Sequence, residues 1–96
     1  MGIEEILKFK RQEILDLAGR HGAYDIRVFG SVARGESRSD SDVDFLVKTS
    51  ESTSPWFPAG LALDLETILQ RRVDIVTERS LHWYIRDRIL KEAVPL

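Results

Sequence analysis

The chain alternates between two hydrophobic patterns, one typical of helices and one typical of strands. Apolar residues recur at helical spacing over residues 3–20 and 59–71, and again after Ser80 through about Lys91. The pattern predicts three amphipathic helices, and a serine at position 80 could cap the last one. Their buried stripes are expected at Ile3, Leu7, Ile14 and Leu17, at Leu61, Leu65, Ile68 and Leu69, and at Leu81, Ile85 and Ile89.

Between these helices lie three short segments rich in β-branched and aromatic residues. Residues 24–29, 43–48 and 73–77 each combine such residues over a length typical of strands. Helices and strands thus alternate along 96 residues, which is enough for one domain with a modest core. We expect residues 1–96 to form a single domain of α/β or α+β class, with helices packed on a small mixed β-sheet.

The turn that follows the first predicted strand combines a glycine with a hydroxyl. Gly30 has no Cβ, so a phosphate oxygen or another backbone segment can approach it closely. Ser31 could cap a short helical turn running through Arg34, and backbone N–H groups at such a turn point toward an anion. A cation at Arg34 could either remain solvated or contact the same anion.

Two carboxylates stand at the start of the second predicted strand. Asp42 and Asp44 are two residues apart, so they project from the same face, while Val43 faces the core. Asp74, inside the third predicted strand, could join them if the two strands are neighbours. Three carboxylates repel one another unless a cation lies between them, and oxygen ligands favour a hard divalent ion such as Mg²⁺. The sequence therefore predicts a metal site next to an anion-binding turn.

Other interpretations of these acids are open. Asp42 and Asp44 could be ordinary surface residues. They could also belong to a calcium-binding loop, but the turn of an EF-hand needs a glycine where this chain has Phe45. Asp74 could instead be a structural acid paired with Arg71 or Arg72.

The spacing of these motifs resembles that of a known superfamily. Gly30-Ser31, then ten residues, then Asp42-Val43-Asp44 is similar to the motif of nucleotidyltransferases related to DNA polymerase β. The small size, the later Asp74 and the chain's ending at residues 89–96 resemble the minimal nucleotidyltransferase (MNT) family. The resemblance covers nearly the whole chain.

The resemblance implies specific roles for these residues. Gly30 and Ser31 would contact the β- and γ-phosphates of ATP, and Asp42 and Asp44 would ligate two Mg²⁺ ions. Asp74 would help to bind the catalytic metal and activate the acceptor hydroxyl. Many members are antitoxins that transfer AMP from ATP to a tyrosine of a HEPN-domain RNase toxin, so the resemblance implies such a toxin as partner.

One segment departs from the family pattern, and two other functions stay open. Residues 49–60 form a polar loop bounded by prolines, where relatives often pass more directly into a helix. Trp56 and Phe57 in this loop could fold back onto the domain or form a patch for a partner. The chain could therefore be a catalytically idle module that acts by occlusion. It could also transfer nucleotides to a small molecule or to RNA.

Composition limits the remaining possibilities. The net charge is −2 and there is no dense basic tract, so we expect no stable complex with nucleic acid. The chain has no cysteine, which excludes thiolate chemistry and suits a reducing compartment. No apolar run is long enough to span a membrane, and the acidic start does not resemble a signal peptide. We expect a cytoplasmic protein that can form homo- or hetero-oligomers.

Overall fold

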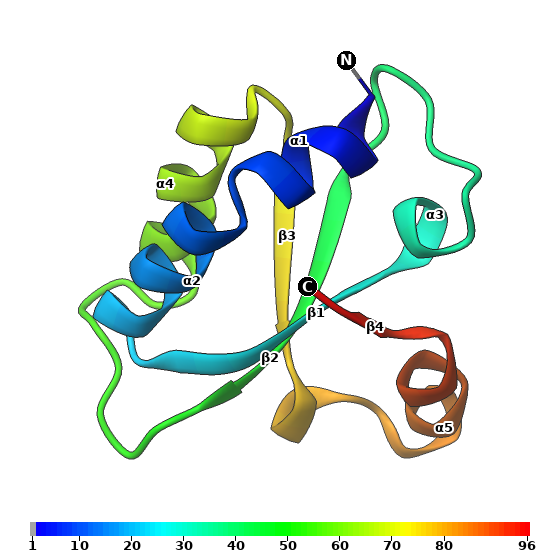
Figure 1. Ribbon diagram of the computed structural model, residues 1–96. Coiled ribbons are helices and arrows are strands. Elements are labelled where there is room, and N and C mark those ends of the chain that lie inside the picture. The colour runs from blue at the N-terminus through cyan, green and yellow to red at the C-terminus, as the bar shows by residue number, and fades with distance from the viewer. Residues whose placement is uncertain (1) are drawn as a thin grey trace.

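A four-stranded mixed sheet with helices packed against it forms the molecule, as the computed structural model of residues 2–96 shows (Figure 1). The fold class predicted from the sequence is confirmed. In chain order the elements are α1 (Ile3–Phe9), α2 (Arg11–Arg20), β1 (Ala23–Phe29), α3 (Gly30–Ala33), β2 (Val43–Thr49), α4 (Ala59–Leu69), β3 (Val73–Thr77), the 3₁₀ turn η1 (Glu78–Ser80), α5 (Trp83–Glu92) and β4 (Val94–Pro95).

The strand order in the sheet is β3-β2-β1-β4. β1 pairs antiparallel with β2 on one side and with β4 on the other, whereas β2 and β3 run parallel. A parallel neighbour requires a crossover connection, and α4 provides it. β2 is therefore an interior strand, and the start of β2 lies beside the start of β3.

Helices α1, α2 and α4 pack on one face of this sheet and bury the main core with it (Figure 1). Val43, Phe45 and Val47 of β2 face these helices and are at most 1% exposed. Full burial of side chains this size stabilises a fold by roughly 1.5–3 kcal/mol each. Because residues of a strand alternate, the intervening positions of β2 belong to the opposite face.

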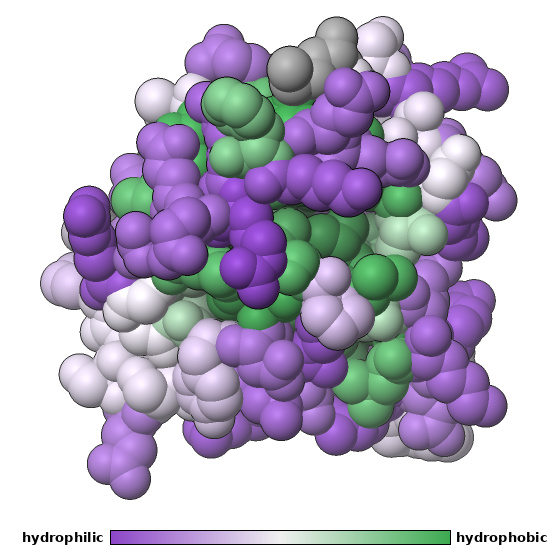
Figure 2. Space-filling view, viewed as in Figure 1, coloured by the Kyte–Doolittle hydropathy of each residue, from purple (hydrophilic) through white to green (hydrophobic). Residues whose placement is uncertain are grey.

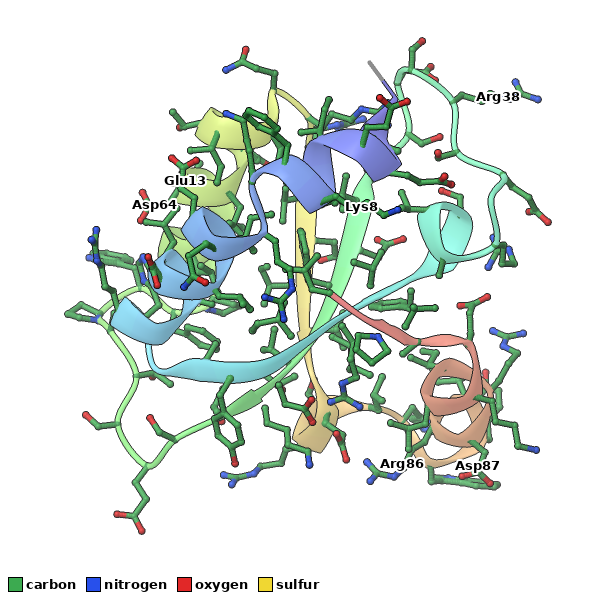
Figure 3. The ribbon with its side chains drawn as sticks, in the orientation of Figure 1. Lys8, Glu13, Arg38, Asp64, Arg86 and Asp87 are labelled. Carbon is green, nitrogen blue, oxygen red and sulfur yellow. The ribbon has the colours of Figure 1, made fainter. Side chains whose placement is uncertain are left out.

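Helix α5 reaches that opposite face through a shared carboxylate. Arg27 of β1 donates to Glu78 Oε2 at 2.6 Å, and Arg86 of α5 donates to Glu78 Oε1 at 3.3 Å. Arg27 is the register partner of Leu46, which is fully buried outside the main core cluster. Figure 3 shows Arg86 with Asp87 on α5, apart from the layer of α1, α2 and α4.

The predicted helix over 3–20 is bent into two. The break falls at Lys10, whose φ is −101° and ψ is 13°. Hydrogen bonds continue across it, from Lys10 N–H to the Ile6 carbonyl and from Ile14 N–H to the Lys10 carbonyl, both at 2.9 Å. Neither Gly nor Pro lies at the bend.

The end of the chain differs most from the sequence-based expectation. Ser80 does not cap the last helix, because it lies in η1 and its hydroxyl donates to the Thr77 carbonyl at 2.9 Å. α5 begins at Trp83 instead. The two residues of β4 were not predicted, and Pro95 is tolerated there because the strand lies at the sheet edge.

The loop between β2 and α4 is held by His21. The ring of His21 hydrogen-bonds Ser54 through Nδ1 and Asp64 through Nε2, the latter at 2.7 Å. Figure 3 shows Asp64 on the side of α4 that faces α2. Phe57 packs against the core, as one of the two alternatives for this pair predicts, whereas Trp56 is 86% exposed. A patch for a partner at Trp56 stays a prediction. The loop follows the end of β2 that is opposite Asp44, and so lies away from the predicted acids.

The surface shows one apolar concavity in the view of Figure 2, between α1 and the C-terminal strand. It is a groove of about 300 Å³ whose apolar lining includes Leu7, Val28, Val32 and Val94. Over residues 2–96, none of the helices has the length and apolar character that crossing a bilayer requires.

Candidate active site

The three predicted carboxylates belong to one face of the sheet, where β2 lies beside β3. Asp44 and Asp74 are direct register partners in this parallel pair, and such partners lie on the same face. Asp42 precedes Asp44 by two residues, so the alternation carries it to that face too. Val43 and Phe45 alternate with them and are fully buried under the helices. The acids therefore lie on the side away from α1, α2 and α4.

Asp44 is a carboxylate in an unfavourable electrostatic environment. Its pKa is raised from 3.8 to about 6, mainly by burial and then by the charges of Asp74 and Asp42. Arg34 lowers the pKa of Asp44 but does not cancel these effects. A partly buried carboxylate surrounded by like charges favours a bound cation, which would relieve the repulsion.

Gly30 brings the turn after β1 into contact with Asp44. Its φ is +74°, a backbone conformation that favours glycine, and a Cβ at this position would collide with Asp44 Oδ2. α3 begins at the same residue. Because the first N–H groups of a helix have no acceptor within the helix, the turn presents backbone donors next to the acid cluster.

Ser31 does not have the capping role predicted for it. Phe29 occupies the N-cap position of α3, and no side chain caps this helix. The short helical turn itself is confirmed, and Arg34 is its C-cap. Ser31 is instead a half-buried residue in the first turn of α3. Its predicted phosphate contact stays a prediction.

Arg34 is held by two carboxylates, one of which the sequence reasoning missed. Its Nη1 donates to Glu92 Oε1 at 2.6 Å and its Nε donates to Glu36 Oε2 at 3.1 Å. The second oxygen of Glu92 accepts the Gly30 N–H at 3.0 Å. The available signal was the position of Glu92 in the last turn of a helix, where the macrodipole disfavours an acid.

The loop between α3 and β2 is ordered by Ser41 and Arg71. The Arg38 N–H donates to Ser41 Oγ at 2.8 Å, and Ser41 N–H donates to the Arg38 carbonyl at 3.1 Å. Arg71 Nη1 donates to the carbonyls of the same two residues at 2.8 and 3.2 Å. The side chain of Arg38 projects outward from the loop (Figure 3). Ser41 therefore orders this loop through both its side chain and its backbone.

Two alternative roles for the acids are wrong. A calcium-binding loop would need Phe45 to lie in a turn, but Phe45 lies in β2 and is paired on both sides. Neither Arg71 nor Arg72 pairs with Asp74. Arg71 donates to the Arg38 carbonyl, and Arg72 Nε lies 3.5 Å from Asp42 Oδ1 in an exposed ion pair. Within residues 2–96 no ion pair to Asp74 is formed.

The donor set of the acid cluster suits a hard divalent cation. Carboxylate oxygens are the protein ligands that Mg²⁺ prefers, and it keeps water and substrate phosphate in its remaining positions. Burial and the charges of Asp74 and Asp42 raise the pKa of Asp44, so a cation bound beside it would be favoured. As the side chains stand, no three His, Cys, Asp or Glu groups of the described chain converge closely enough to hold an ion by themselves. The acids fit Mg²⁺ in chemistry, as part of a site that substrate phosphate would complete.

Comparison with known proteins identifies the family of this chain. The model of the nucleotidyltransferase domain matches residues 3–96. The protein adenylyltransferase MntA of Thermococcus cleftensis is 41% identical over 92 residues, which are 96% of this chain and 90% of that protein.

Solved structures agree with this match. A candidate minimal nucleotidyltransferase superposes with a TM-score of 0.86 at 50% identity, covering 100% of this chain and 97% of its own. A toxin–antitoxin complex with AMP-PNP contains a chain of the same fold, with a TM-score of 0.74 at 23% identity over 88% of this chain and 69% of that one. The chain belongs to the nucleotidyltransferase domain family and has the fold of a minimal nucleotidyltransferase.

Proposed function

We propose that this protein is a Mg²⁺-dependent adenylyltransferase that moves AMP from ATP to a hydroxyl group. The observation that carries the proposal is the pairing of Asp44 with Asp74 across β2 and β3, directly beside the Gly30 turn. Phosphoryl-type transfer needs phosphate held near carboxylates that bind a divalent cation. A relative at 41% identity carries the name protein adenylyltransferase, which supports the choice of AMP as the group transferred.

In this proposal Asp42, Asp44 and Asp74 would hold the metal. Two bound Mg²⁺ ions would supply positive charge for the triphosphate and lower the pKa of the attacking hydroxyl. The open backbone at Gly30, the N–H of Ser31 and the N–H groups of Arg34 that Glu36 and Glu92 leave free would bind and orient the β- and γ-phosphates. Bound in this way, the α-phosphate would lie in front of the acids, open to attack from the side opposite the leaving group.

The transfer itself forms one bond and breaks one. The acceptor oxygen bonds to the α-phosphorus while the bond from that phosphorus to the bridging oxygen breaks. Pyrophosphate leaves with the bonding electron pair. Asp74 takes the proton of the acceptor hydroxyl, a role that suits its exposed position next to Asp44.

The acceptor we propose is a tyrosine on a HEPN-domain RNase toxin, so that the protein acts as an antitoxin. The motif resemblance supports this choice, and a protein of the same fold was solved in a toxin–antitoxin complex with AMP-PNP. A tyrosine hydroxyl on a partner would reach the acids from the sheet face that α1, α2 and α4 leave free.

Transfer of label from α-labelled ATP tests this function. Purified protein, Mg²⁺ and the toxin encoded beside it should yield a labelled toxin, and Asp42→Asn with Asp44→Asn should reduce the rate at least about a hundredfold. Asp40→Asn is the matched control, because this acid lies in the exposed turn and should leave the rate within about twofold. Full activity of the double variant would rule out the mechanism.

A binding module that acts by occlusion is the second candidate. Exposed aromatic side chains favour it, among them Trp56 at 86%, Trp83 at 80% and Tyr84 at 69% exposure. Exposed aromatics are typical of protein interfaces. The same experiment separates the two functions, because occlusion predicts toxin neutralisation without label and without any effect of the aspartate substitutions.

A further inference from the structure

Glu92 links the last helix to both groups that the proposed function assigns to phosphate. Its Oε2 accepts the N–H of Gly30 at 3.0 Å, and its Oε1 accepts Nη1 of Arg34 at 2.6 Å. The two donors are 62 and 58 residues away in the sequence, and the carboxylate is 21% exposed. Both oxygens of one side chain are thus engaged with the edge of the candidate active site.

An ionised Glu92 at this position destabilises α5. It is the last residue of α5, where the negative end of the macrodipole repels a carboxylate. The hydrogen bond from Arg34 lowers the pKa of Glu92, and the bond from Gly30 adds to this effect. The acid is therefore kept ionised by its partners in the site, and those partners offset the unfavourable helix position.

The contacts of Arg34 leave part of its guanidinium free for a third anion. Glu36 and Glu92 engage Nε and Nη1, and the remaining N–H groups of the fork have no protein acceptor within the described residues. Glu92 joins Arg34 to Gly30, and Gly30 lies against Asp44, so the guanidinium is held at the edge of the acid cluster. Glu36 is 64% exposed, so Glu92 is the better ordered of the two supports.

We propose that Glu92 is a positioning residue for the nucleotide: it fixes the Gly30 turn and the Arg34 guanidinium in the arrangement that the triphosphate meets. Glu92 does not touch the substrate itself. The inference rests on the proposed function, because it requires that this turn binds phosphate. The opposite role is a carboxylate that occupies the phosphate site and must be displaced, and this role predicts the opposite change in affinity.

Glu92→Gln separates these roles. Glutamine has one acceptor oxygen, so it can serve Gly30 or Arg34 but not both, and its NH₂ group would face the other donor. Losing one charge-assisted hydrogen bond should weaken binding of Mg²⁺–AMP-PNP about tenfold by calorimetry. In the transfer reaction, KM for ATP should rise by a similar factor with little change in kcat. Asp87→Asn is the matched control, an exposed acid on the same helix whose loss should change affinity less than twofold.

A double-substitution cycle distinguishes positioning from a general loss of stability. In an Arg34→Gln background, the Glu92→Gln change should weaken nucleotide binding by less than about twofold, because Arg34 is already gone and the one glutamine oxygen can still accept the Gly30 N–H. Unchanged or tighter AMP-PNP binding in Glu92→Gln, or fully additive effects in the cycle, would overturn the inference. If the wild-type protein bound no Mg²⁺–AMP-PNP, the proposed function would fail instead. The Gly30 amide proton shift in the nucleotide-free protein would then still report whether Glu92 holds the turn.

Discussion

Asp44 is an acid whose ionised form the fold destabilises. It is half-buried, it has Asp42 and Asp74 as neighbours, and its pKa is raised to about 6. In the unfolded chain the same group titrates near 3.8. Between these two values the folded protein holds a proton that the unfolded chain has lost, so stability falls as the pH rises through this window. Above about pH 6 the full cost is present.

Asp44→Asn should therefore stabilise the metal-free protein while it abolishes transfer. At pH 7.5 the free energy of unfolding should rise by about 1 kcal/mol, a value reduced for the partial exposure of the group. At pH 2.5, well below both values, the carboxyl is neutral in both states and the difference should disappear. Urea unfolding in the presence of a chelator measures both values. A less stable variant at pH 7.5, or an equal gain at both pH values, would contradict this explanation.

Gly30 offers a second test at the residue scale, with Gly35 as its internal control. Both residues have a positive φ, +74° and +73°, so an alanine at either costs roughly 1 kcal/mol in backbone strain. Only at position 30 would the new Cβ strike Asp44, since nothing lies within 4 Å at position 35. Gly30→Ala should lose Mg²⁺–AMP-PNP binding by calorimetry, whereas Gly35→Ala should keep it. Equal loss in both variants would show that the collision with Asp44 is not the cause.

At the scale of elements, Glu78 joins three segments that are distant in the sequence. Its carboxylate accepts Arg27 of β1 and Arg86 of α5, and its own residue lies in η1 at the end of β3. The hydrogen bond from Arg27 lowers the pKa of Glu78. A lowered pKa stabilises the fold above the unfolded value of 4.5, and that contribution is lost as the pH falls below it.

Glu78→Gln should lower the free energy of unfolding at pH 7 by about 2 kcal/mol, because a half-buried arginine loses its counter-charge. The difference from wild type should shrink as the pH drops below 4. Glu51→Gln, an exposed acid in the loop after β2, should be neutral in the same thermal and urea measurements. A loss that does not change with pH would show that shape rather than charge explains the effect.

The local pattern of apolar and β-branched residues was sufficient to predict the two strands that carry the acids. The ends of β3 are those predicted, and β2 differs by one residue, because both strands are β-branched runs with clear limits. β4 has only two residues, one of them a proline, and it forms only because β1 leaves an open edge. Pairings of this kind depend on the assembled sheet, so no window of sequence contains them.

The same limit explains what was missed in the candidate site. The turn at Gly30 and the acids Asp42 and Asp44 lie within 15 residues of one another, so their spacing could be recognised. Asp74 was placed beside Asp44 only on the assumption that their strands are neighbours, which the parallel pairing confirms. Glu92 contacts the turn from 62 residues away, and a lone acid near the end of a helix gives little warning of such a contact.

For the molecule as a whole, the sheet separates the hydrophobic core on one face from the candidate active site on the other. α1, α2 and α4 form a continuous apolar layer with one face, and the acids belong to the other. α5 and β4 then return the end of the chain to the side of the Gly30 turn, through Glu92 and through the pairing of Val94 with Val28 (Figure 1). The site is therefore assembled from both halves of the chain and depends on the complete sheet.

The two-sided character of β2 has a consequence for how this strand can vary. Val43, Phe45 and Val47 stabilise the fold and should set how much folded protein a cell retains, whereas Asp44, a proposed metal ligand on the other face, should be needed for turnover at a cost in stability. Substitutions at the core positions of β2 should therefore lower the abundance of the protein, whereas substitution of Asp44 should lower its activity without lowering its abundance. Leu46 is the exception, because it is fully buried on the face that carries the proposed active site. A lineage that no longer needed transfer could therefore gain stability by losing a single charge at the centre of its sheet.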